Sequence, residues 1–491
     1  MNDLSEHPGP AVQRLSEKNL FRLARDVVVP DYDRSKVRIG VVHFGPGAFH
    51  RGHQACYLDS MLASDPRWAI CGVELKSERF ATALEPQDCL YVVTQLGRDM
   101  RYRVVGALKE CLTAMRQPDA IFARLVRPEV KLVTMTVTEK AYCLDGSGAL
   151  DLAHPDIAHD IRRPAVPRSA VGWLAEGLAR RKALRVPPFA AVSCDNMASN
   201  GEKLKKALLS FVRSSGQKDL AAWIEDEARF PCTMVDSITP AADDALRAKV
   251  TAATGLYDAA PVQREQYQQW VVEDILGPEQ PDLASVGVNL TKDVGAFEKA
   301  KLRLLNGAHS TLAYIGLLSG YTSVLEAMGD VALSHFVIRL MREDVAPSLA
   351  PAVGLDLDAY IGVIVARFRN PALTHLLYQI ASDGSQKLPH RILGTIKDAI
   401  QGGRPIARLV VPVAAWMRFV AREAKEGRAL DDPLGRILAG IGGACTGRAI
   451  DDLPRFLELR NVFDSELASA APFVAALGSA YDDLTRCLTA N

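Results

Sequence analysis

Residues 37–54 read VRIGVVHFGPGAFHRGHQ, an apolar run that leads directly into a cluster of glycines. The run predicts a buried parallel strand, and the residues from about Gly47 to Leu62 predict a helix. Such a strand–glycine–helix segment can bind a dinucleotide, because small residues admit the pyrophosphate and the helix start offers N–H groups. On spacing alone a plain tight turn is an equal interpretation, because His50 stands where a third glycine would be.

Strand-like and helical patterns alternate through the first 290 residues. Further strands are expected at 68–75, 90–94, 102–105, 130–137 and 189–193, and helices at 119–125, 169–181 and 201–212. This alternation predicts an α/β, Rossmann-like NAD-binding domain over residues 1–290, with a mostly parallel sheet and an N-terminal extension over residues 1–36.

Amphipathic helical patterns replace the strands after Asp293. They predict an all-α domain for substrate binding and catalysis over residues 291–491. Helices are expected at 296–319, 322–342, 357–367, 371–381, 391–401, 405–424, 433–440, 451–456 and 465–488.

Composition argues against several kinds of partner. The 491 residues carry a formal net charge of zero, so no basic surface for nucleic acid is expected. No apolar run is long enough to span a membrane, and the first twenty residues do not form a signal peptide. The nine cysteines are scattered, without a C-x-x-C pair, which indicates reduced thiols in a cytoplasmic protein. Nothing specifies a subunit interface, so we expect a monomer or a weak oligomer.

A second informative segment, KLRLLNGAHSTL at residues 301–312, combines an amine, an amide and an imidazole with leucines. At about 100° per residue, Lys301, His309 and Asn306 lie at roughly 0°, 80° and 140° and share one face. Such groups are costly to bury unless they are paired or used. Burial also lowers the pKa of a lysine, which can then act as a general base near neutral pH.

The cofactor site would need an acid after the second strand to bind a ribose hydroxyl. Glu74 and Glu78 are both candidates, and Glu78 has the better spacing. Because Arg79 follows and could accept a 2′-phosphate, NAD is expected but NADP stays possible. No metal is expected, because nothing around His50 and His53 indicates the ligand set that completes a zinc site. The candidate cofactor-binding residues are Gly45, Gly47, Phe49, His50, Arg51 and Glu78.

Basic residues gather after the turn-forming Asp383-Gly384-Ser385. Lys387, His390 and Arg391 lie close in sequence, and His375 precedes them. A substrate carboxylate would need such a cationic partner. The alternative is that Lys387 and Arg391 belong to a solvated helix start.

Seven motifs in this order together resemble the mannitol dehydrogenase family, the polyol-specific long-chain dehydrogenases and reductases. They are GPGAFHRGHQACY, TVTEKAYC, SCDNMASNG, FPCTMVDSITP, QWVVEDILG, AKLRLLNGAHSTLAYIGLLSGY and DGSQKLPHR, between residue 40 and about residue 395. The segments VTEKAYC, FPCTMVD, NPALTH and YQIASDGSQKLPHR are most similar to its fructuronate reductase branch. The mannitol branch usually has arginine where Gln379 stands here.

The resemblance implies a zinc-independent enzyme that interconverts a secondary alcohol and its ketone with NAD. The preferred substrate pair is D-mannonate and D-fructuronate, the alternative is a mannitol or arabinitol 2-dehydrogenase, and a distant alternative is a nucleotide-binding sensor without catalysis. By resemblance, Lys301 is the general base, Asn196 and Asn306 hold the reacting oxygen, and His309 orients Lys301 and the substrate. Asp236 and Lys387 would bind substrate, although Asp236 could instead cap a helix, and Glu139 would lie in a proton path.

Overall fold

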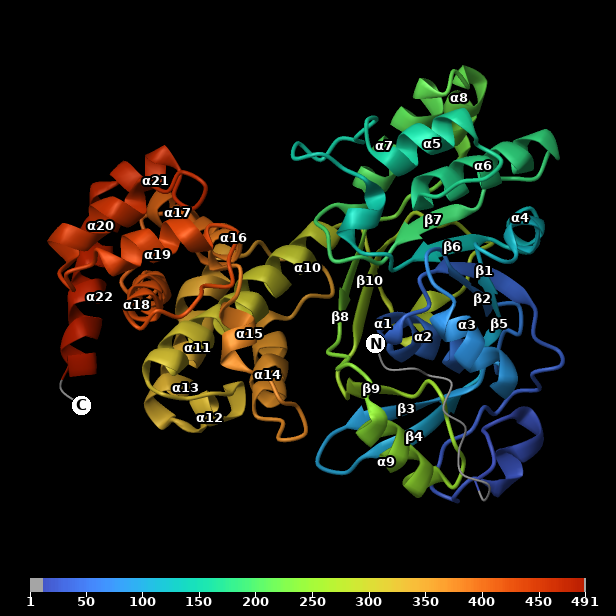
Figure 1. Ribbon diagram of the computed structural model, residues 1–491, viewed down its shortest axis with the longest axis horizontal. Coiled ribbons are helices and arrows are strands. Elements are labelled where there is room, and N and C mark those ends of the chain that lie inside the picture. The colour runs from blue at the N-terminus through green and yellow to red at the C-terminus, as the bar shows by residue number, and fades with distance from the viewer. Residues whose placement is uncertain (1–11, 490–491) are drawn as a thin grey trace. The chain divides into compact units, whose positions relative to one another are not determined.

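The computed structural model describes residues 12–489. The chain divides into two compact units, Met1–Gly295 and Ala296–Asn491. Residues 1–11 of the expected N-terminal extension lie outside the described part. The first unit contains the β-sheets, and helices dominate the second (Figure 1). The expected combination of a Rossmann-like α/β region and a helical C-terminal region is therefore confirmed.

The largest sheet of the first unit is parallel and has the strand order β5-β2-β1-β6-β7. Its strands are β1 (Ile39–Phe44), β2 (Ala69–Glu74), β5 (Leu108–Thr113), β6 (Leu132–Met135) and β7 (Ala190–Ser193). Successive residues of β1 enter different cores, with Val41 in one and Val42 in the other. Burial on both faces explains the continuous apolar run. Strand order reverses at β1, so the carboxyl ends of β1 and β6 form the place where such sheets bind ligands.

Helices cover both faces of this sheet. Helices α2 (Gln54–Met61) and α3 (Arg79–Leu84) belong to one core, and α4 (Pro118–Leu125), α6 (Ala170–Ala183), α7 (Asn200–Ser214) and α8 (Lys218–Glu227) belong to the other. The other helical segments of this unit are η1 (Glu17–Arg22), α1 (Ala48–Gly52), η2 (Glu85–Gln87), η3 (Glu139–Tyr142), α5 (Pro155–Arg162), α9 (Asp244–Thr254) and η4 (Leu283–Val286).

The helix expected from Gly47 to Leu62 is broken in the structure. His53 separates α1 from α2, with φ −124° and ψ −92°. Its Nε2 lies 2.9 Å from the carbonyl oxygen of Gln269. A Cβ at Gly52 would come within 3.1 Å of Val262, so the break accompanies close packing of α1 against β9.

Two three-stranded sheets complete the first unit. One has the order β4-β3-β9 and the other β11-β10-β8. Their strands are β3 (Tyr91–Leu96), β4 (Arg101–Val105), β8 (Thr233–Asp236), β9 (Val262–Glu265), β10 (Gln269–Glu273) and β11 (Asn289–Thr291). The strands expected at 90–94 and 102–105 therefore form an antiparallel pair outside the main sheet.

The second unit is built from helices packed around buried side chains such as Leu312 and Trp416. From the unit boundary onward the helices are α10 (Val294–Ala300), α11 (Gly307–Leu318), α12 (Val324–Gly329), α13 (Val331–Arg339), α14 (Leu357–Phe368), α15 (Leu377–Ala381), α16 (Gly384–Leu388), α17 (Gly394–Gln401), α18 (Val411–Lys425), α19 (Gly435–Gly443), α20 (Ala449–Leu457), α21 (Ser465–Ser469) and α22 (Ala471–Thr489). Between them lie the π-helical segments η5 (Lys301–Asn306), η6 (Leu340–Val345) and η8 (Pro389–Leu393), and the 3₁₀ turn η7 (Ala346–Ser348).

Two helices that the amphipathic pattern predicted as continuous are interrupted or shortened in the structure. The expected helix 322–342 is interrupted at Asp330, whose carboxylate accepts a hydrogen bond from the Leu333 amide at 3.0 Å and so caps α13. Residues 371–376 are not helical, and α15 begins only at Leu377.

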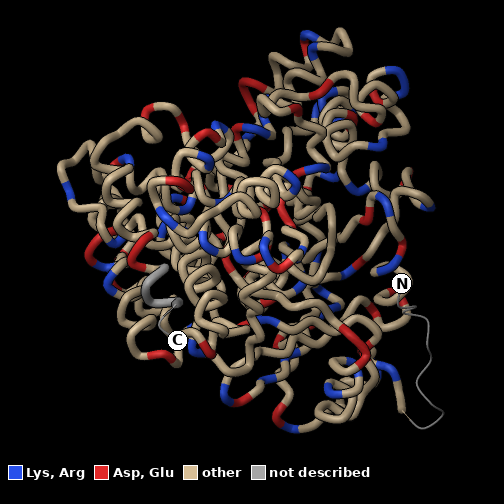
Figure 2. Tube along the Cα trace, turned by 60° about the vertical axis from the view of Figure 1, so that its left-hand side comes forward, with Lys and Arg blue, Asp and Glu red and all other residues tan. Residues whose placement is uncertain are grey.

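Charged residues of both signs occur throughout the described chain. Lys and Arg are interspersed with Asp and Glu along the described part of the trace (Figure 2). None of the described helices has both the length and the apolar composition needed to cross a membrane.

Candidate active site

The glycine turn after β1 has a backbone that requires glycine. Gly45 has φ +89°, and a Cβ there would come within 2.4 Å of the Thr136 carbonyl oxygen. The Gly45 amide donates to the Val73 carbonyl at 3.0 Å, and the Gly47 amide donates to the Gly45 carbonyl at 2.7 Å. The turn thus joins the carboxyl ends of β1 and β2 and delivers the chain into α1.

Several predicted cofactor residues lie beneath this turn and support it. Arg51 is buried, and its Nε donates to the Pro46 carbonyl at 3.1 Å. His43 is also buried and contacts Thr134 Oγ1 through Nδ1 at 2.7 Å. The His50 ring stacks on it at a centroid distance of 3.3 Å. Burial lowers the pKa of His43 to about 3 and that of His50 well below its ordinary value, so both rings are neutral.

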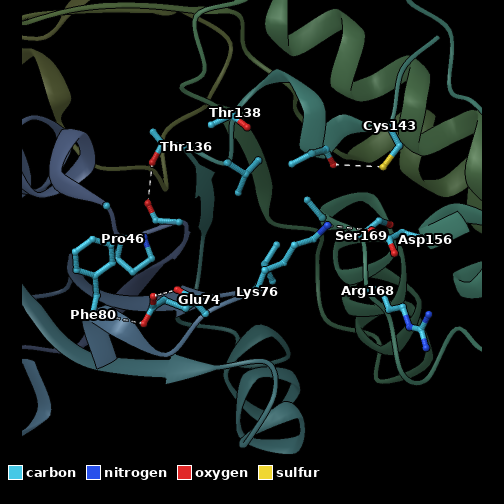
Figure 3. Close-up of a pocket in the computed structure, with 17 residues that line it drawn as sticks. Pro46, Glu74, Lys76, Phe80, Thr136, Thr138, Cys143, Asp156, Arg168 and Ser169 are labelled. Atoms are coloured by element: carbon cyan, nitrogen blue, oxygen red, sulfur yellow. Dashed lines mark hydrogen bonds and ion pairs between the residues drawn. The ribbon is translucent and has the colours of Figure 1, made fainter. Parts of the chain in front are cut away.

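A cavity of about 300 Å³ opens beside the turn (Figure 3). Residues after the carboxyl ends of β1, β2 and β6 line it, together with the loops around α5 and α6. Its lining residues are Gly45, Pro46, Gly47, Glu74, Leu75, Lys76, Ser77, Phe80, Thr136, Val137, Thr138, Ala141, Cys143, Asp156, Arg168, Ser169 and Ala170. The cavity fits a dinucleotide, because it lies at the carboxyl ends of parallel strands and has small residues and apolar walls. Of the predicted cofactor residues, Gly45 and Gly47 line the cavity, and Phe49, His50, Arg51 and Glu78 do not.

Glu74, the acid at the end of β2, accepts hydrogen bonds from groups of the same unit. Glu74 is buried, and its Oε2 accepts the amides of Phe80 at 2.9 Å and Ala81 at 2.8 Å. Its Oε1 accepts the hydroxyl of Ser77. Glu74 therefore fixes the start of α3. Glu78 pairs instead with Arg116 at 3.0 Å.

A buried carboxylate that the sequence analysis did not select links two predicted site loops. Asp195 accepts the amides of Val137 at 3.1 Å and Thr138 at 2.8 Å, and the Tyr142 hydroxyl at 2.7 Å. Burial raises the pKa of Asp195. Thr138 has φ +72°, so the carboxylate holds a strained turn. The signal in the sequence was an aspartate two residues after a strand and directly before an asparagine.

The predicted residues Glu139 and Asn196 adjoin this network. Glu139 follows Thr138 and Asn196 follows Asp195, and both are exposed. Asp236 lies elsewhere in the unit as the buried last residue of β8, opposite Gln269 of β10. It does not cap a helix, because the cap of α9 is Asp243.

In the second unit, Lys301 and Asn306 are the first and last residues of the π-helix η5. The Gly307 amide donates to the Leu302 carbonyl, the five-residue spacing that defines a π-helix. Residues five apart then lie one turn apart, which places Lys301 and Asn306 on the same side. They and His309 are partly exposed, whereas Leu304 and Leu305 are buried. The three predicted catalytic residues therefore share a face, although the helix is not α-helical there.

His309 and His375 form a neutral pair beside this face. Their rings meet edge to face at 5.7 Å, and Phe368 lies 4.5 Å from His309. Burial lowers the pKa of both imidazoles, that of His309 well below its ordinary value. Each Nε2 is buried and makes no hydrogen bond within the described part of the chain. These nitrogens are suited to meet a ligand hydroxyl.

The predicted basic residues differ in whether a carboxylate lies within ion-pair distance. The Lys387 amine donates to the Ser382 carbonyl at 2.6 Å and pairs with Asp383 at 3.7 Å. Burial lowers the pKa of Lys387. Arg391, in η8, donates to Ser310 Oγ at 3.1 Å and lies 3.5 Å from the Asn306 carbonyl, and no carboxylate pairs with it among residues 12–489. His390 is exposed.

Comparisons with known proteins identify both units. Residues 39–284 match the mannitol dehydrogenase Rossmann domain, and residues 293–485 match the mannitol dehydrogenase C-terminal domain. D-mannonate oxidoreductase of Escherichia coli (strain K12) is 38% identical over 467 residues, covering 93% of this chain and 96% of that protein. Mannitol 2-dehydrogenase of Phaeosphaeria nodorum (strain SN15) is 36% identical over 488 residues, covering 97% and 84%.

A solved structure is similar as well. The ternary complex of Pseudomonas fluorescens mannitol 2-dehydrogenase with NAD and D-mannitol superposes with a TM-score of 0.78 at 35% identity, covering 97% of this chain and 98% of that one. These similarities confirm the resemblance inferred from the motifs, and with it the expectation of an oxidoreductase.

Proposed function

This chain belongs to the mannitol dehydrogenase family, and from that premise we propose that it is an NAD-dependent oxidoreductase that interconverts D-mannonate and D-fructuronate. The observation that carries the choice of a sugar acid is Arg391, a half-buried cation without a carboxylate partner in the described chain, beside Asn306. Similarity alone does not decide the substrate, because the relatives named for D-mannonate and for mannitol are 38% and 36% identical. The alternative is therefore an enzyme for uncharged polyols.

The residues around the glycine turn fit NAD. The turn at Gly45 and Gly47 and the cavity wall at Thr136 would hold it, since they combine small residues with the carboxyl ends of parallel strands. When bound, NAD accepts the hydride that the alcohol carbon releases.

Lys301 is the proposed general base. Its amine takes the hydroxyl proton while the C–H electron pair leaves as hydride, so the alcohol becomes a ketone. The Asn306 amide donates a hydrogen bond to the oxygen as negative charge develops there, and Asn196 is the proposed second donor. Neutral His309 can exchange a hydrogen bond with Lys301 or the substrate without adding a competing positive charge.

The two basic residues of the second unit have different proposed roles. Lys387 pairs with Asp383, and its amine donates to the carbonyl oxygens of Ile380 and Ser382. We propose that Lys387 contacts a substrate hydroxyl, which needs no uncompensated charge. Arg391 has no paired carboxylate in the described chain, so its guanidinium can pair with a carboxylate of the substrate. A guanidinium pairs with a carboxylate more strongly than with a neutral hydroxyl, which favours an aldonate over a polyol.

The first test is a substrate comparison. Purified protein is mixed with NAD⁺ and, separately, D-mannonate, D-mannitol or D-arabinitol, and reduced nicotinamide is followed by absorbance. Activity on D-mannonate alone supports the proposal. Activity only on the polyols keeps the family and contradicts the substrate, and silence with all three contradicts the proposed reaction.

Arg391→Gln tests the carboxylate contact directly. We expect KM for D-mannonate to rise by about tenfold or more with kcat less affected, because one charge-assisted contact is lost. Arg408→Gln is the matched control, since Arg408 already pairs with Asp344 at 2.8 Å. A fall in kcat at unchanged KM would instead assign Arg391 to positioning Asn306.

A further inference from the structure

An ion pair crosses the cavity beside the glycine turn (Figure 3). Lys76 follows β2 and Asp156 lies in the first turn of α5, and both line the cavity. The Lys76 Nζ is 3.0 Å from Asp156 Oδ2. The lysine side chain is 71% exposed and the aspartate side chain 22% exposed, so the amine remains accessible to a ligand.

The end of β2 is where a dinucleotide-binding fold distinguishes its two cofactors. An acid there binds the 2′-hydroxyl of NAD, and a nearby cation accepts the 2′-phosphate of NADP. Here the carboxylate of Glu74 is already occupied by the Ser77 hydroxyl and by two amides of α3. The acid at the usual place therefore has a structural role.

The residues that the sequence suggested for this choice lie off the cavity. Glu78 and Arg79 are absent from its lining, and Glu78 pairs with Arg116. Of the two basic side chains that line the cavity, Arg168 is directed away from Glu74 (Figure 3). The Lys76 side chain starts just after the end of β2, and its amine points toward Asp156 (Figure 3).

We propose that Asp156 sets the preference for NAD over NADP by neutralising Lys76. This inference rests on the proposed binding of a nicotinamide dinucleotide in this cavity. The Asp156 carboxylate compensates the amine that a 2′-phosphate would require, and it repels that dianionic group. The 2′-hydroxyl of NAD meets no such penalty. Removing Asp156 leaves Lys76 free to pair with the phosphate.

The test measures binding without turnover. NADH and NADPH are titrated into the purified full-length protein and binding is followed by nicotinamide fluorescence. We expect the wild type to bind NADH more tightly. Asp156→Asn should bind NADPH about fivefold more tightly than the wild type, with NADH affinity within about twofold. Asp156→Ala should show the same gain, which guards against a folding defect specific to one variant.

Two controls separate this role from a general charge effect. Adding Lys76→Met to Asp156→Asn should abolish the gain, because the phosphate would lose its partner. Glu279→Gln removes the carboxylate of another exposed lysine pair, that with Lys131 at 2.7 Å, outside the cavity lining. It should leave both affinities within about twofold.

The possible failures are distinguishable. A wild type that binds NADH, with Asp156 variants that gain nothing for NADPH, overturns the inference alone. A gain that persists without Lys76, or a wild type that prefers NADPH, also overturns it. A wild type that binds neither nucleotide overturns the proposed function and this inference together.

Discussion

Lys301 is the residue whose removal should separate cofactor binding from chemistry. It opens η5 in the second unit, whereas the glycine-turn cavity is lined by residues of the first unit. Lys301→Ala should lower kcat by about 10²–10⁴-fold at neutral pH, the usual contribution of a general base. NADH affinity, measured by fluorescence titration, should stay within about twofold.

Lys299→Ala is the matched control for this variant. Lys299 lies two positions earlier and pairs with Asp398 at 3.4 Å, so its loss removes a charge without touching the proposed site. Near-normal turnover of Lys301→Ala would remove Lys301 from the mechanism.

Individual catalytic candidates could be predicted where polar residues interrupt an apolar helical pattern. Lys301, Asn306 and His309 interrupt a leucine-rich helix, and that conflict is visible without coordinates. Whether Arg391 has a carboxylate partner could not be predicted, because that depends on which carboxylates the fold brings near it. The same is true of Lys76, whose partner Asp156 lies 80 residues away.

At the scale of elements, the periodic pattern located most helices and strands, but it predicted some helices as continuous that are broken in the structure. A period of 3.6 residues assumes an α-helix, so it could not reveal the π-helix η5 or the break at His53. The break at His53 accompanies the contact of its ring with the carbonyl oxygen of Gln269, which is 216 residues away. The π-helical spacing brings Lys301 and Asn306 to one side, which is why the predicted shared face exists despite the wrong local geometry.

The loop that carries Asn196 depends on the carboxylate of Asp195, and a matched pair of variants tests this. Asp195 accepts two amides and the Tyr142 hydroxyl. In the second unit, Asp452 accepts the amides of Thr446 and Gly447 and the Tyr481 hydroxyl at 2.7 Å. Asparagine presents an N–H group in place of one acceptor oxygen, so each variant should lose about 1–3 kcal/mol of unfolding free energy.

Only Asp195→Asn should also impair catalysis, by about tenfold in kcat, because it should displace Asn196, the proposed second donor to the reacting oxygen. Urea unfolding measures the shared loss and steady-state kinetics measures the difference. Equal kcat effects for Asp195→Asn and Asp452→Asn would show that Asp195 contributes to stability alone.

For the whole molecule, alternating strands and helices were enough to predict the class of each region. The parallel sheet follows from strands buried on both faces and joined through helices. The two small sheets did not follow, because some of their pairings join strands that are remote in sequence. Val93 of β3 pairs with Val262 of β9, for example, and no local pattern encodes that partner.

Histidines that are neutral in the native state make the stability of the molecule depend on pH. The native state holds His43, His50 and His309 unprotonated, because burial lowers the pKa of each ring. In the unfolded chain these rings take up protons below about pH 6.5. Between that pH and the lowered native values, the unfolded state binds more protons, so the free energy of unfolding rises with pH and falls as pH is lowered.

The expected loss is about 1.4 kcal/mol per pH unit for each such histidine, so several acting together should destabilise the protein steeply below about pH 6. Urea unfolding followed by circular dichroism at pH 7.5, 6.0 and 5.0 measures this slope. His43→Gln should be less stable at pH 7.5, because the Thr134 contact is disturbed, yet its pH slope should be shallower by about one histidine's share. An unfolding free energy that stays constant or rises as the wild type is acidified from pH 6.5 to 5.0 would contradict the expectation that these histidines dominate the pH dependence.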